Sequence, residues 1–202
     1  MRLDFRFIAS LSVMLLLFVT ARPAEAVLAD FEQFSDLESV TNQIGGVTFS
    51  NAIALQAGLS LNEFEFPPRS GSTVLSDDFG AMSILFSTKI TSFSAYFTYL
   101  TQLTITAFDD ADVMVASATS AFDANMVFSG DLGSSANELL TLMHGSGIRR
   151  VSITGFPDGG SFVMDDMSFD TAVSTVPTPS SPALFALALA LLAAHRGVRR
   201  RS

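Results

Sequence analysis

Two pairs of carboxylates could hold a metal ion. Asp30 and Glu32 are two residues apart, and Asp165 and Asp166 are adjacent in an otherwise apolar run. Neighbouring side chains on a strand point to opposite faces, so one of Asp165 and Asp166 must point inward or against a neighbour. A buried charge needs a partner, and calcium takes about six to eight oxygen ligands. If the first and last strands pair, one structural calcium ion could lie between the two pairs.

Two alternatives to this calcium site stay open. Asp165 and Asp166 could be solvated at the rim of a sheet, or could pair with Arg149 or Arg150. A second acidic cluster, formed by Asp109, Asp110 and Asp112, has the composition of a hairpin turn, and neither cluster has the spacing of an EF-hand loop.

Carbohydrate binding would need an exposed aromatic platform. The chain has no tryptophan and two tyrosines, Tyr96 and Tyr99, which flank the end of an expected strand. They are the candidate sugar contacts, although two ordinary half-buried tyrosines are the commoner outcome. Most of the 19 phenylalanines fall at alternating strand positions, which is typical of a core.

The sequence offers little support for an enzyme. Outside the two ends of the chain there is one histidine, His144, next to a flexible Gly-Ser-Gly, and there is no cysteine. A hydrolase needs a nucleophile, a base and an orienting partner, and carboxylate pairs arise easily by chance in an acidic domain. We therefore expect no catalytic site.

The elements that must position these residues are short strands. No helical periodicity runs through residues 27–170, and roughly ten runs rich in Val, Ile, Thr and Phe alternate with turn residues, which predicts an antiparallel two-sheet sandwich. The expected strands are residues 28–34, 47–55, 61–66, 81–87, 90–97, 101–108, 113–119, 122–128, 138–144, 148–155 and 161–170.

The charge of this central domain limits its partners. Residues 27–170 hold 18 acidic residues against four basic ones, a net charge of −14. Nucleic acid is therefore excluded as a partner, because like charges repel across such a surface.

The start of the chain predicts export. Residues 1–26 combine Arg2 and Arg6, an apolar stretch over residues 7–19 and the small-residue pattern Ala24-Glu25-Ala26, which together are typical of a secretory signal peptide cleaved after Ala26.

The end of the chain predicts a membrane segment. Residues 171–202 begin as a Ser/Thr/Pro linker and continue as a short transmembrane helix over residues 183–194, about 18 Å long. The basic flank marks the cytoplasmic side by the positive-inside rule. It consists of Arg196, Arg199, Arg200 and Arg201.

The tail, residues 176–202, resembles the PEP-CTERM sorting domain of Gram-negative bacteria. The motif position is filled by Val176, Pro177, Thr178 and Pro179, with Thr178 where that family usually has glutamate. The resemblance implies processing by an exosortase after passage through the secretion machinery. The protein would cross the inner membrane transiently through its tail and then reach the cell surface or the medium, often in an exopolysaccharide setting.

The central domain also looks like a jelly-roll module of exported bacterial proteins. The segments that carry this resemblance are residues 104–109, 147–153 and 162–169. The leading hypothesis is a non-enzymatic cell-surface or extracellular-matrix protein. The alternative is an exopolysaccharide-binding module, and a secreted hydrolase is less favoured.

Overall fold

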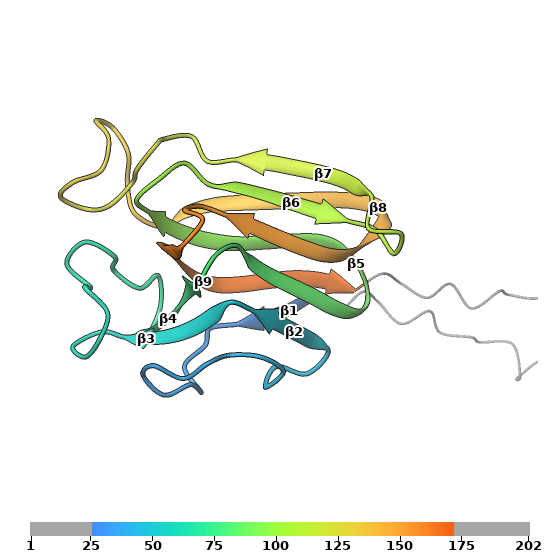
Figure 1. Ribbon diagram of the computed structural model, residues 1–202, viewed down its shortest axis with the longest axis horizontal. Coiled ribbons are helices and arrows are strands. Elements are labelled where there is room, and N and C mark those ends of the chain that lie inside the picture. The colour runs from blue at the N-terminus through green and yellow to red at the C-terminus, as the bar shows by residue number, and fades with distance from the viewer. Residues whose placement is uncertain (1–25, 172–202) are drawn as a thin grey trace, which may run out of the picture. The chain divides into compact units, whose positions relative to one another are not determined.

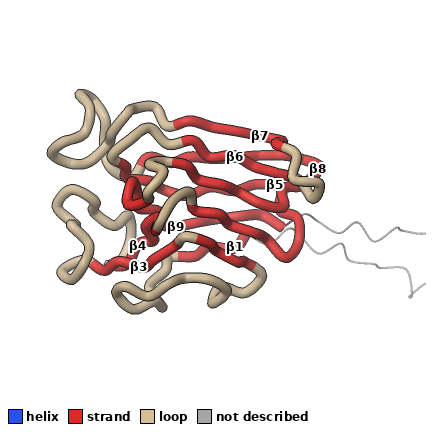
Figure 2. The backbone as a smooth tube through the Cα atoms, in the orientation of Figure 1, coloured by secondary structure: helices blue, strands red, loops and turns tan. Residues whose placement is uncertain are grey.

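The computed structural model describes residues 26–171, and this part of the chain is built entirely from strands and loops, with no helix (Figure 2). The nine strands are β1 (Ala26–Ala29), β2 (Val47–Ser50), β3 (Ala52–Gln56), β4 (Thr73–Asp78), β5 (Met82–Tyr99), β6 (Thr104–Phe108), β7 (Met114–Thr119), β8 (Glu138–Thr154) and β9 (Gly159–Thr171).

All paired strands are antiparallel, and the two long strands β5 and β8 are shared by two halves of the fold (Figure 1). In the first half, β9 pairs with β4 and β1 on one edge and with residues 90–99 of β5 on the other. Residues 138–143 of β8 pair with the other side of this part of β5 and are the next strand of the sheet. In the second half, the order is β2, residues 82–86 of β5, residues 148–154 of β8, then β6 and β7.

The two halves pack against each other through one apolar core. Phe86 of the second half meets Phe169 of the first, with ring centroids 5.1 Å apart. Alternate residues of β5 supply much of this core, because a strand with one face inward buries every second side chain. The buried core residues on β5 are Met82, Ile84, Phe86, Ile90, Phe93, Ala95, Phe97 and Tyr99.

The predicted all-β, antiparallel architecture is confirmed, as is the pairing of the first and last strands, since β1 lies beside β9. The predicted strand over residues 101–108 buries one face, because Leu103, Ile105 and Ala107 are all buried.

Several predicted strand boundaries are wrong. Residues 81–87 and 90–97 form one strand, and residues 138–144 and 148–155 form another, because each long strand bends without ending. Residues 61–66 and 122–128 lie in loops and turns. The strand β4 was not expected. The run 47–55 divides at Asn51, whose φ of 57° ends β2.

The predictions for both ends of the chain lie outside the described residues. They concern the signal peptide of residues 1–26, nearly all of the linker, the sorting motif at Val176–Pro179, the short transmembrane helix and its arginine flank. Within residues 26–171, no helix is long and apolar enough to cross a membrane.

Candidate functional site

The outer side of the first half presents an open face on three neighbouring strands. Its side chains alternate with core residues such as Phe93 and Phe97, so they point away from the core. We define the open face by Ser92, Ser94 and Tyr96 on β5, Leu139, Thr141 and Met143 on β8, and Ser168 and Asp170 on β9.

The strand register arranges these side chains in rows. Ser94 lies between Ser168 and Thr141, which makes a row of three hydroxyl groups. In the next row Ser92 lies between Asp170 and Met143, and the Ser92 hydroxyl donates to Asp170 Oδ2 at 2.7 Å.

On the other side of the hydroxyl row, Tyr96 lies between Asp165 and Leu139. Leu139 and Met143 are 51% and 74% exposed, so larger apolar groups border the hydroxyl row along β8. With strands about 4.8 Å apart, three strands make a surface about 10 Å wide.

The segment between β3 and β4 covers the neighbouring part of the same outer surface. Leu61 from this segment is buried with Val74 and Val163 in a small second core. The segment then brings Arg69 over Tyr96, with 4.7 Å between the guanidinium carbon and the ring centroid. Tyr96 remains partly exposed beneath it. A guanidinium group over an aromatic ring is a favourable cation–π arrangement.

Three carboxylates hold this segment in place, and we call them the loop clamp. Asp165 Oδ2 accepts from the backbone N–H groups of Arg69 and Ser70, at 2.7 and 3.0 Å. Asp166 Oδ1 accepts from the Ser70 hydroxyl at 2.7 Å. Glu32 Oε1 accepts from the backbone N–H groups of residues 72 and 73, at 2.9 and 2.7 Å.

A bulge in β9 explains why both adjacent aspartates reach the same segment. Asp166 has a φ of 46°, and the register between β5 and β9 shifts between Ser94 and Tyr96. An extra residue at a bulge breaks the simple alternation of a strand. The expectation that Asp165 and Asp166 point to opposite faces is therefore wrong.

The predicted metal ligands divide into two groups. Glu32, Asp165 and Asp166 lie in the loop clamp, whereas Asp30 is exposed and accepts from the backbone N–H of Glu32 at 3.4 Å. In residues 26–171, no group of three or more acidic, histidine or cysteine side chains could hold a metal ion. Calcium at these carboxylates stays a prediction, which a calcium-dependent shift of the thermal midpoint would test.

Asp165 is the buried member of the loop clamp, with 1% of its surface exposed. Burial raises the pKa of its carboxyl to about 6, although backbone N–H donors from Ser70, Asp166 and Arg69 favour the ionised form. The loop clamp therefore contains one acid that titrates well above the usual range.

Tyr99 does not belong to the open face. Its side chain is fully buried, its hydroxyl donates to Glu138 Oε2, and burial raises its pKa to about 12. The predicted sugar contact at Tyr99 is wrong, because Tyr99 shares the inward parity of Phe97 on β5 whereas Tyr96 has the outward parity.

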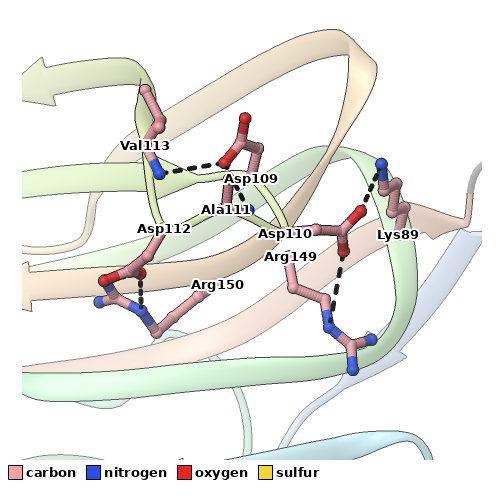
Figure 3. Close-up of polar contacts among 8 residues, drawn as sticks. All are labelled: Lys89, Asp109, Asp110, Ala111, Asp112, Val113, Arg149 and Arg150. Carbon is pink, nitrogen blue, oxygen red and sulfur yellow. Dashed lines mark hydrogen bonds and ion pairs between the residues drawn. The ribbon is translucent and has the colours of Figure 1, made fainter.

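The arginines offered as partners of Asp165 lie elsewhere. Both arginines are on β8 and pair with aspartates in the turn between β6 and β7 (Figure 3). Arg150 Nη2 is 2.5 Å from Asp112, and Arg149 Nε is 3.9 Å from Asp110. Lys89 also pairs with Asp110, at 2.5 Å. Three of the four basic residues of the domain thus pair with this acidic turn.

Sequence reasoning missed Arg69 and the hydroxyl row of Ser94, Thr141 and Ser168. The signal for the row was available as the alternation of polar residues with Phe and Ala on β5 and with Phe169 on β9. The sequence did not show which strands lie beside each other in this row, because the register between strands distant in sequence is set by the fold.

No family model matches this chain, and no curated protein matches it. A solved cleaved adhesin domain of Lys-gingipain is similar at 13% identity and a TM-score of 0.46, over 72% of this chain and 99% of that chain. Another such adhesin domain, from Porphyromonas gingivalis, has 7% identity and a TM-score of 0.47, over 73% and 98% of the two chains. A variant of a family 29 carbohydrate-binding module has 12% identity and a TM-score of 0.41, over 78% and 99%. With TM-scores this low, any function must rest on this chain's own side chains.

Proposed function

We propose that this chain is an exported, non-enzymatic surface protein whose jelly-roll-like sandwich binds polysaccharide on the open face. The observation that supports this most directly is the position of Tyr96 and Arg69 beside a row of hydroxyl groups. Arg69 covers one side of the Tyr96 ring, so the uncovered part of the ring would offer an apolar surface to the C–H side of a sugar. The guanidinium, hydroxyl and carboxylate groups around it would exchange hydrogen bonds with sugar hydroxyls.

The electrostatics of the open face favour a neutral chain of sugars over an anionic one. Asp170 lies on the face, whereas Lys89, Arg149 and Arg150 pair with the acidic turn of the other half. Arg69 is the remaining basic residue of residues 27–170. An anionic polymer would meet an acidic domain and one cation, which is unfavourable.

Export and sorting complete the proposal. The signal peptide of residues 1–26 would direct the chain to the secretion machinery, and an exosortase would process the tail near Val176–Pro179. The intact mass of the protein from each host-cell fraction tests this step. Loss of both ends would support sorting, whereas a membrane-bound form that keeps Ser202 would contradict it.

Binding to the host's own exopolysaccharide tests the function. We expect the full chain to be retained by that polymer in affinity electrophoresis, and Tyr96→Ala to lose most of the retention. Phe79→Ala is the matched control, because Phe79 is an aromatic side chain that is 84% exposed and lies in the turn between β4 and β5, away from the open face. Equal retention of the two variants would contradict the assignment of the face. Absence of retention for the unmodified chain would contradict polysaccharide binding.

A further inference from the structure

The first part of β8 has a free edge. Residues 138–143 pair with β5 on one side, and within residues 26–171 no strand pairs with them on the other. The second part of the same strand is different, because β6 occupies its other edge from residue 150 to residue 154. Alternate backbone N–H and C=O groups of residues 138–143 therefore have no strand partner on that side, and β7 lies close to β8 without pairing with it.

The residues of this edge do not protect it. The sequence Leu139-Leu140-Thr141-Leu142-Met143 contains no charge, proline or glycine. Natural sheets usually protect an exposed edge with charged residues, with proline or with a bulge. Here Leu140 and Leu142 point into the core, and Leu139 and Met143 are largely exposed on the open face. An unguarded apolar edge with regular alternation suits the addition of a strand.

The same residues are complementary to themselves. An antiparallel pair of two such strands, with a two-fold axis at Thr141, places Leu139 opposite Met143 and Leu140 opposite Leu142. Thr141 then lies opposite Thr141 of the second copy. At the ends, Glu138 lies opposite His144, so no two like charges face each other. A two-fold interface requires this kind of self-complementarity.

We propose that two copies of this chain pair antiparallel through residues 138–143 of β8. The pairing extends the first half of each copy into one continuous sheet and covers Leu139 with Met143 of the other copy. It also places the two open faces side by side with Thr141 at their centre. The dimer itself does not depend on the ligand of the open face.

A cysteine at the two-fold axis tests the pairing in the full chain, which has no cysteine of its own. Directly opposite residues have Cβ atoms about 4.5–5.5 Å apart, close to the separation that a disulfide needs. We expect most of an exported Thr141→Cys chain to run as a reductant-sensitive dimer on a gel. Thr154→Cys is the control, because Thr154 is exposed on the same strand but lies where β6 covers the edge. Equal dimer yields, or a cross-link to a different protein, would overturn the proposal.

A charge at the same position gives a second, independent measurement. We expect the unmodified full chain in detergent to sediment as a dimer and Thr141→Lys to sediment as a monomer, because two like charges would lie opposite each other. Thr154→Lys should remain a dimer, and thermal unfolding of each variant shows that it folds. A monomeric unmodified chain, or a Thr141→Lys variant that stays dimeric, would overturn the pairing.

Discussion

Arg69 is bound to the sheet at two points: its guanidinium lies 4.7 Å above the ring of Tyr96, and its backbone N–H donates to Asp165 Oδ2 at 2.7 Å. The side chain and the backbone of one residue thus connect the loop clamp to the open face. The acids predicted as metal ligands and the tyrosine predicted as a sugar contact meet at this residue.

We expect Arg69→Ala to lower the free energy of unfolding by about 0.5–1 kcal/mol, which is the usual size of an exposed cation–π contact. Arg69→Lys keeps the charge but loses the planar group, so its free energy of unfolding should lie between those of the unmodified chain and Arg69→Ala. Urea unfolding measures both. Tyrosine fluorescence in a Tyr99→Phe background reports the surroundings of Tyr96, because the chain has two tyrosines and no tryptophan. An unchanged Tyr96 signal in Arg69→Ala would contradict the stacking.

The buried carboxyl of Asp165 makes stability depend on pH. Its pKa in the fold, about 6, lies above the ordinary value of 3.8. Between these values the folded state holds a proton that the unfolded state has lost, so the contribution of Asp165 to stability falls as pH rises. It is greatest below about pH 4 and is lost by about pH 7.

Asp165→Asn tests this pH dependence. In the unmodified chain, Asp165 should lower the free energy of unfolding by on the order of 2–3 kcal/mol between pH 4 and pH 7, and Asp165→Asn should remove this decrease. The variant should also be less stable overall, because it loses an acceptor oxygen. Asp158→Asn, at an exposed turn position, should leave the slope unchanged. Parallel slopes for the unmodified chain and Asp165→Asn in urea unfolding would contradict the elevated pKa.

The buried hydroxyl of Tyr99 should stabilise the fold through Glu138. We expect Tyr99→Phe to cost about 1.5–3 kcal/mol in urea unfolding, because a partly buried carboxylate loses a donor. The pKa of about 12 also predicts a stability loss between about pH 10 and pH 12 in the unmodified chain, since the unfolded state ionises first. Tyr99→Phe should not show this loss of stability at alkaline pH, because phenylalanine has no hydroxyl group to ionise. A variant as stable as the unmodified chain at neutral pH would contradict the hydrogen bond.

Asp112 combines two roles that substitutions can separate. It has a φ of 59°, which asparagine and glycine tolerate better than alanine, and it pairs with Arg150, whose guanidinium also lies 3.8 Å from the centroid of the Phe108 ring. We expect Asp112→Asn to cost about 0.2–1 kcal/mol, in a manner that salt reduces. Asp112→Ala should cost about 1 kcal/mol more, through backbone strain. Equal effects of the two substitutions in thermal unfolding would contradict the backbone role.

The pattern of residues along each strand was sufficient for much of the fold. Phenylalanines at alternating strand positions were expected in the core, and Phe93 and Phe97 are buried on one face of β5, because a strand has a period of two residues wherever one side is buried. The turn at Asp109–Asp112 was also predicted, since Asp109 Oδ1 accepts from the backbone N–H groups of Ala111 and Val113 within the same turn. Both features arise from contacts near in sequence.

The sequence alone determined that the domain is all-β and acidic, and it identified Tyr96 and the acids at both ends of the domain as residues of interest. Only the tertiary structure decided that Tyr99 is buried while Tyr96 lies outward, and that Glu32, Asp165 and Asp166 hold the segment at Arg69. The reason is that strand register, the bulge at Asp166 and the bends of β5 and β8 depend on pairing between distant segments. Local alternation states which residues share a face, but not which faces meet.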